Sequence, residues 1–154
     1  MSICNGKHTD LTQINQVIAQ AVMAWPMPER IKRLSVPVLS YDSEDFKHYQ
    51  FLLLKKVDLI VGVAVWNAKT SVMTSRGTGR LLHGLYIAPA FQGRGYGQQL
   101  MGQIFAEAGA LGVDGVLVKA ERPAIGFFKH CGLQSLPASN DTDYPYQFWH
   151  QLKS

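Results

Sequence analysis

One segment of this chain constrains its fold more than any other: Leu81–Leu100, which reads LLHGLYIAPAFQGRGYGQQL. An apolar run typical of a strand ends at Pro89, a loop containing Gly93, Gly95 and Gly97 follows, and a helical pattern begins directly after it. A strand, a glycine loop and a helix N-terminus in this order direct several backbone N–H groups toward one point, where they can bind an anion. The segment therefore predicts a binding site for a phosphorylated cofactor.

The loop lacks the two best-known phosphate-binding patterns. The chain has no GxxxxGK[ST] sequence, and Gly93 and Gly95 are not followed by the third glycine of GxGxxG. Glycine spacing alone is weak evidence, because a tight turn without a ligand also needs glycine. The residues that flank the loop must decide between a tight turn and a cofactor site.

Hydrophobic periodicity predicts a mixture of helices and strands. Helices are expected over Asp10–Ala24, Pro28–Leu34, Gln98–Leu111 and Pro123–His130, with Pro26 and Pro37 ending the first two. Strands are expected over Tyr49–Lys55, Leu59–Asn67, Arg80–Ala88, Val116–Ala120 and Asp143–Leu152, with a polar loop over residues 68–79. The first two strands are expected to form an antiparallel hairpin. This order predicts an α+β fold with a mixed sheet.

The bulk properties predict one soluble, cytoplasmic domain over residues 1–154. The longest apolar run, Leu59–Trp66, is far too short to span a membrane, and the N-terminus lacks a signal-peptide pattern. Cys4 and Cys131 form no zinc-binding pattern, so no metal is expected. The net charge of +4 favours an anionic ligand, but the basic residues are scattered, and Arg30–Arg33 is typical of a solvated helix face. We therefore expect neither a nucleic acid nor a membrane as partner.

Two motifs resemble the GNAT superfamily of acyl-CoA-dependent N-acyltransferases. The pattern Gln92-x-x-Gly95-x-Gly97, preceded by Leu85–Pro89 and followed by a helix, is similar to the cofactor signature of that family. Downstream, Ala124–Leu133 (AIGFFKHCGL) is similar to the family's Ala-x-x-Phe-Tyr-x-x-x-Gly-Phe segment. The order of predicted elements also fits along nearly the whole chain.

The resemblance implies a central mixed, mostly antiparallel sheet flanked by helices, and acetyl-CoA as co-substrate. Backbone groups of the strand before the loop would pair with the pantetheine arm, and amides of the loop would bind the pyrophosphate. The cofactor-binding residues that it implies are Leu85, Tyr86, Ile87, Gln92, Gly93, Arg94, Gly95, Tyr96, Gly97, Gln98 and Phe128.

The chain departs from the family pattern at the expected catalytic positions. Phe128 stands where many members carry a tyrosine that protonates the thiolate, and Glu121 stands where an asparagine is common. Val116 stands where some members carry a carboxylate that acts as the general base. The familiar acid and base are therefore both absent, although an amine that is already neutral needs mainly positioning.

His83 is the best replacement for the base, two residues before Leu85 in the same predicted strand. Some relatives, the arylalkylamine N-acetyltransferases among them, place a histidine at the equivalent point. The alternative is a structural histidine under the sheet. Glu121 is a second candidate, to bind a cationic amine or act through a water, unless it is merely solvated. Tyr96 is a weaker candidate for the acid, because packing beside the cofactor explains it as well. Cys131 is a weaker candidate for the acid or for a nucleophile, because an inert buried thiol explains it as well.

Together these features predict direct transfer of an acetyl group to a primary amine in a ternary complex. The acceptor is left open between a small metabolite, an antibiotic-like amine, and a peptide terminus or lysine. Three alternatives stay open: a CoA-binding sensor without catalysis, transfer of a longer or charged acyl group, and a nucleotide-binding module. The aromatic segment Tyr144–Trp149 could support a homodimer.

Eight aromatic or methionine side chains are expected mostly in the core, with some as candidates for the wall of an acceptor pocket. These are Trp25, Met27, Tyr41, Phe46, Trp66, Tyr144, Tyr146 and Trp149. Glu44, Asp141 and Asp143 are candidates to attract a cationic amine, with no pattern that places them at a site.

Overall fold

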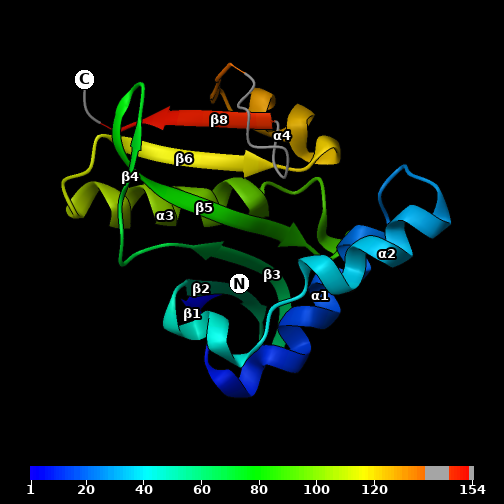
Figure 1. Cartoon of the computed structure of the whole chain (residues 1–154). Coiled ribbons are helices and arrows are strands. Elements are labelled where there is room, and N and C mark those ends of the chain that lie inside the picture. Colours follow the sequence, from blue (N-terminus) through cyan, green and yellow to red (C-terminus); the bar gives the residue numbers. More distant parts are fainter. Residues whose placement is uncertain (138–145, 153–154) are drawn as a thin grey trace. The chain divides into compact units, whose positions relative to one another are not determined.

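The computed structural model describes residues 1–137 and 146–152 of the chain (Figure 1). Its helices are α1 (Leu11–Met23), α2 (Glu29–Leu39), α3 (Tyr96–Ala110) and α4 (Ile125–His130), with short 3-10 helices η1 (His8–Asp10), η2 (Ser43–Lys47), η3 (Pro89–Phe91) and η4 (Arg122–Ala124). Its strands are β1 (Ser2–Asn5), β2 (Gln50–Lys56), β3 (Leu59–Trp66), β4 (Val72–Thr74), β5 (Gly77–Ile87), β6 (Gly115–Ala120), β7 (Gln134–Ser135) and β8 (Tyr146–Gln151).

The strands form one mixed sheet in the order β1-β2-β3-β5-β6-β8-β7, with β4 attached to β5. Strands β5 and β6 are parallel, whereas β1–β2, β4–β5, β6–β8 and β7–β8 are antiparallel. The predicted α+β class with a mixed, mostly antiparallel sheet is therefore confirmed. No helix in the described ranges is long and apolar enough to cross a membrane.

The chain divides into two compact units, which we describe separately. The first unit comprises Met1–Val65 and Leu85–Met101, and the second comprises Trp66–Gly84 and Gly102–Ser154. Strand β5 and helix α3 each contribute one part to either unit.

The first unit is built around the apolar face of α1. Its helical repeat buries Ile14, Ile18 and Val22 completely, against Phe51 of β2 and Val63 of β3 among others. Each such side chain contributes about 1.5–3 kcal/mol through burial. The predicted helix and hairpin of this region are confirmed, with η3 and the glycine loop continuing from the same unit.

Helix α2 runs through Pro37, so the prediction that this proline ends the helix is wrong. Pro37 lies in the last turn, where its ring removes only the N–H that would bond to the carbonyl of Arg33. The backbone N–H and the hydroxyl of Ser40 both donate to the Val36 carbonyl oxygen, at 3.0 and 2.7 Å. These two hydrogen bonds stabilise the last turn of α2, which lacks the bond that Pro37 cannot donate.

The second unit is built around Trp149 of β8, which is 1% exposed. Trp149 pairs with Leu117 across the β6–β8 ladder, and its ring lies on Gly79 and Gly115, where a side chain would collide with it. Further along β8, His150 stacks on Phe105 of α3, with ring centroids 3.7 Å apart. Two glycines therefore make room for the largest side chain of this core.

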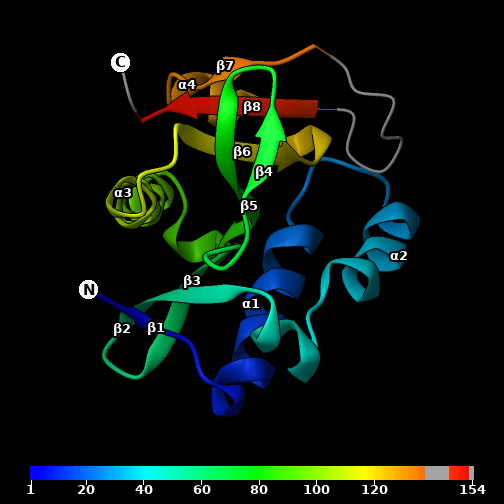
Figure 2. The same ribbon diagram turned by 60° about the vertical axis from the view of Figure 1, so that its left-hand side comes forward.

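Three strands, β1, β4 and β7, lie where none was expected. Strand β1 pairs with β2 from Ser2↔Lys55 to Asn5↔Leu52. Strand β4 lies within the predicted polar loop and forms a hairpin with the start of β5, visible in Figure 2. All three strands are short, and none alternates regularly between apolar and polar residues, so their sequences carry little strand signal.

We expect Gly115→Ala to destabilise the protein by about 2–3 kcal/mol, because overpacking of a core forces its neighbours to shift. An added Cβ would overlap the Trp149 ring and lie 2.6 Å from the His150 carbonyl oxygen. Urea denaturation measures the change. The matched control is Gly102→Ala in α3, where an added Cβ meets nothing within 4 Å and should stabilise the helix by about 0.5–1 kcal/mol. Equal effects of the two substitutions would contradict this account of the core.

Candidate functional site

The glycine loop of the first unit has a defined geometry. The side chain of Gln92 folds back on the preceding strand, its Nε2 donating to the carbonyl oxygen of Ile87 at 2.9 Å. Gly93 and Gly95 have φ angles of +75° and +83°, which other residues adopt only with strain. The Gly95 carbonyl accepts the N–H of Gln99 at 3.1 Å, so the loop leads directly into α3.

The front of this loop has room for a ligand. A Cβ added at Gly93 or at Gly95 would meet nothing within 4 Å, so both glycines border open space. The first N–H groups of an α-helix have no partner within the helix and carry its positive dipole end. The beginning of α3, Tyr96–Gln98, supplies such groups. The arrangement can therefore bind an anion.

Two cationic side chains lie beside the glycine loop, and both contact the same aromatic ring. The guanidinium of Arg94 and the ammonium of Lys56, at the end of β2, each lie 5.7 Å from the centre of the Phe91 ring. Both charges increase the positive potential beside the glycines. Lys56 was not predicted as a site residue, because only the folding of the β2–β3 hairpin brings it to the loop.

The strand before the loop buries its largest side chain. Tyr86 is buried in the core of the first unit, and the N–H of Ala88 donates to the Val61 carbonyl oxygen at 2.9 Å. The side chains of Leu85 and Ile87 are half-buried. Any role of Tyr86 in binding a ligand therefore falls to its backbone.

In the second unit, the ladder between β5 and β6 ends at Leu82↔Val118. His83 is the next residue of β5 after this pair, and Glu121 is the first residue after the end of β6. Both side chains are half-buried. Both residues therefore lie beyond the last pair of this ladder, in the direction of the carboxyl ends of the two strands. Burial raises the pKa of Glu121 above its ordinary value.

Phe128 is buried in the second unit, 4% exposed. Its ring lies 5.3 Å from that of Phe127, edge to face, and 5.6 Å from that of Phe148. The position where the family commonly carries a tyrosine thus holds a core side chain without a hydroxyl. Its contact with the cofactor stays a prediction.

The remaining candidates fall mostly in the core. Tyr41, Trp66 and Trp149 are buried, as predicted, and Trp25 and Phe46 pack against the core of the first unit. Met27, Tyr96 and Cys131 are half-buried, and Glu44 and Tyr146 are exposed. Asp141, Asp143 and Tyr144 lie outside the described residues. Within the described ranges, no group of three or more His, Cys, Asp or Glu side chains could hold a metal ion.

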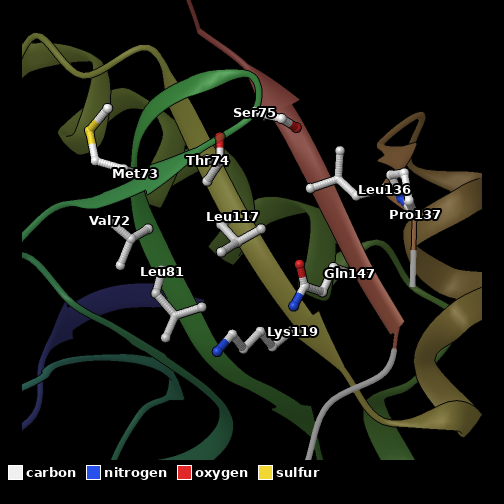
Figure 3. Close-up of a pocket in the computed structure, with 10 residues that line it drawn as sticks. All are labelled: Val72, Met73, Thr74, Ser75, Leu81, Leu117, Lys119, Leu136, Pro137 and Gln147. Atoms are coloured by element: carbon white, nitrogen blue, oxygen red, sulfur yellow. The ribbon is translucent and has the colours of Figure 1, made fainter. Parts of the chain in front are cut away.

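The second unit also contains a cavity of about 410 Å³ on the β4 side of β5 and β6 (Figure 3). Lys119 of β6 and Gln147 of β8 line it, together with apolar side chains. Sequence reasoning missed these two residues. Both lie in runs interpreted simply as strands, and their meeting depends on the β6–β8 register, in which they are partners.

Comparison with known proteins gives one family. The model of the acetyltransferase (GNAT) family matches residues 19–133, well over half of the chain. No match was found among curated proteins.

Solved structures with the same fold include several acetyltransferases. The PaiA N-acetyltransferase of Thermoplasma acidophilum, in complex with coenzyme A, has a TM-score of 0.75 and 13% identity, over 98% of this chain and 99% of that one. A GNAT family acetyltransferase of Brucella melitensis, in complex with acetyl-CoA, has a TM-score of 0.64 and 16% identity, over 99% and 88%. The ribosomal-protein-S18-alanine N-acetyltransferase of Escherichia coli has a TM-score of 0.63 and 15% identity, over 99% and 94%. Such low identities show a shared fold.

The raised pKa of Glu121 predicts a pH-dependent stability. The folded protein holds this proton more tightly than the unfolded chain does. Its contribution is therefore present below the ordinary pKa of 4.5 and is lost as the pH rises through the raised value. Glu121→Gln removes this titration, so its free energy of unfolding relative to wild type should increase from about pH 4 to about pH 7.

Urea denaturation at both pH values tests this expectation. The control is Glu29→Gln, which alters an exposed carboxylate of α2 and should show no such increase. A flat difference between Glu121→Gln and wild type would show that the carboxyl is not desolvated.

Proposed function

Because the chain belongs to the acetyltransferase (GNAT) family, we propose that it binds acetyl-CoA and transfers the acetyl group directly to a primary amine, with residues 1–154 as one acetyltransferase domain. The observation that carries this proposal is the glycine loop at the N-terminus of α3, with open space in front of Gly93 and Gly95. The bound CoA and acetyl-CoA of the structural neighbours support the same choice of ligand.

The residues of the first unit fit the anionic part of this cofactor. The amides from Gly93 to Gln98 would bind the pyrophosphate, because a helix N-terminus and glycines without side chains allow close approach. Arg94 and Lys56 add positive charge beside it. The backbone of Leu85–Ile87 would bind the pantetheine arm as an added strand.

The residues of the second unit supply groups that can handle a proton. Acetyl-CoA, when bound, supplies the activated acetyl group. His83 would accept the proton of the attacking amine at its imidazole. Glu121 would hold the amine or move its proton through a water. Burial raises its pKa, in the direction that a base working near neutral pH requires.

A CoA-binding sensor without catalysis is the second candidate. The observation that favours it is the buried Phe128, which offers no hydroxyl to protonate a thiolate. Sensor and enzyme would both bind CoA, but only the enzyme would release a thiol when acetyl-CoA and an amine are present. Screening amines for thiol release separates the two.

Gly95→Ala should weaken CoA binding at least tenfold, because its methyl group would occupy the open front of the loop. Wild type should gain about 2.7 kcal/mol of stability with CoA at about 100 times its Kd, and nothing comparable from ATP or NAD. Thermal unfolding with each ligand measures this.

The matched control for the loop is Gly112→Ala, after the end of α3. Gly112 has φ +80° and equally open surroundings, so both substitutions carry the same backbone strain of about 1–2 kcal/mol. Only Gly95→Ala should lose CoA binding. An equal loss in both variants, or no stabilisation of wild type by CoA, would overturn the loop as the cofactor site.

His83→Gln should lower kcat/KM for the best amine at least tenfold, with CoA binding unchanged, because general base catalysis is commonly worth 10²–10⁴-fold. Steady-state thiol release as a function of pH measures it, and the loss should shrink at high pH, where the amine is already neutral. His130→Gln, on the exposed end of α4, is the control. A loss below threefold in His83→Gln would assign the histidine a structural role.

A further inference from the structure

The cavity of the second unit is built from two kinds of surface. Figure 3 shows Leu81 and Leu117 in its middle, with Val72 on one side and Leu136 on the other. Lys119 and Gln147 extend across the sheet at one end of it. At the opposite end lie Thr74 and Ser75 of the β4–β5 hairpin. An apolar middle with few polar groups at its ends is typical of a small-molecule site, and about 410 Å³ is within the size range of such sites.

The charge of the lining indicates which ligands the cavity prefers. Lys119 is the only charged side chain among the described lining residues, and no carboxylate stands among them. A carboxylate could bind the ammonium of Lys119 and the amide N–H of Gln147. The aliphatic residues in the middle would receive an apolar side chain.

The charged end of the cavity lies toward the predicted base. Leu81 and Leu117 are partners in the β5–β6 ladder, and their side chains line the same cavity. Because side chains alternate along a strand, Lys119 follows Leu117 on this face, and His83 follows Leu81. A rise of about 3.3 Å per residue places His83 roughly 7 Å beyond Leu81. His83 therefore lies on the face of β5 that lines the cavity, one step beyond Leu81.

We propose that this cavity is the acceptor pocket, and that the acceptor is a free α-amino acid with an apolar side chain. The carboxylate lies on Lys119 and Gln147, the side chain lies between Leu81 and Leu117, and the α-amine is directed toward His83. The last of these assignments rests on the proposed acetyltransferase function, whereas the first two do not.

Calorimetric titration with L-leucine, leucinamide and 3-methylbutylamine tests the pocket without catalysis. The three probes share the side chain and the amine, but only leucine has the carboxylate. We expect leucine to bind at least tenfold more tightly than the other two, in buffer or with millimolar CoA present. Lys119→Met should abolish this preference, Lys119→Arg should retain most of it, and Lys129→Met on the exposed face of α4 should not change it. Failure of leucine to bind under both conditions overturns the proposal.

Acetylation assays separate this proposal from the proposed function. If leucine binds through Lys119 but no thiol is released from acetyl-CoA, the pocket stands and the acetyltransferase function fails. If 3-methylbutylamine is acetylated as efficiently as leucine, the enzyme stands and the amino-acid pocket fails. If the pocket and the acetyltransferase function are both correct, Lys119→Met should raise KM for leucine at least tenfold with little change in kcat. A merely destabilised protein would not give this pattern.

Discussion

The short parallel ladder between β5 and β6 determines most of what the second unit can do. Its residue pairs run only from Gly79↔Gly115 to Leu82↔Val118, after which both strands continue unpaired with each other. At its start, two glycines face each other and admit the Trp149 ring. Beyond its last pair, His83 is the next residue of β5, and Glu121 follows the end of β6. One ladder thus anchors the core at one end and ends beside ionisable groups at the other.

The chain uses ionisable groups sparingly in its interior. None of the buried residues in the described ranges is charged, and the candidate catalytic groups are half-buried. Partial burial shifts the pKa of Glu121 without the large penalty of a fully buried charge. By contrast, His150 is flattened against Phe105, and burial lowers its pKa. The two pKa shifts have opposite signs but the same cause: partial burial favours the neutral form of the Glu121 carboxyl and of the His150 imidazole.

Local signals made the glycine loop and most elements predictable from the sequence. The α1 periodicity, the β2–β3 hairpin and the step from β5 through the glycines to α3 all depend on residues close together in the chain. Signals failed where pairing over long distances decides the outcome. Strand β1 exists because β2 provides an edge, and Lys56 reaches the loop only through the folded hairpin. The cavity residues Lys119 and Gln147 meet only through the β6–β8 register.

The hydrogen bond from Gln92 to the Ile87 carbonyl has a consequence for binding. Together with the glycine φ angles, it holds the loop in shape without a ligand, so the conformational entropy of ordering this segment is lost during folding. An incoming anion then meets a preorganised set of donors and loses little affinity to rearrangement. A chain with a shorter side chain at this position would have to order the loop at each binding event. Gln92 can therefore govern affinity without contacting the anion.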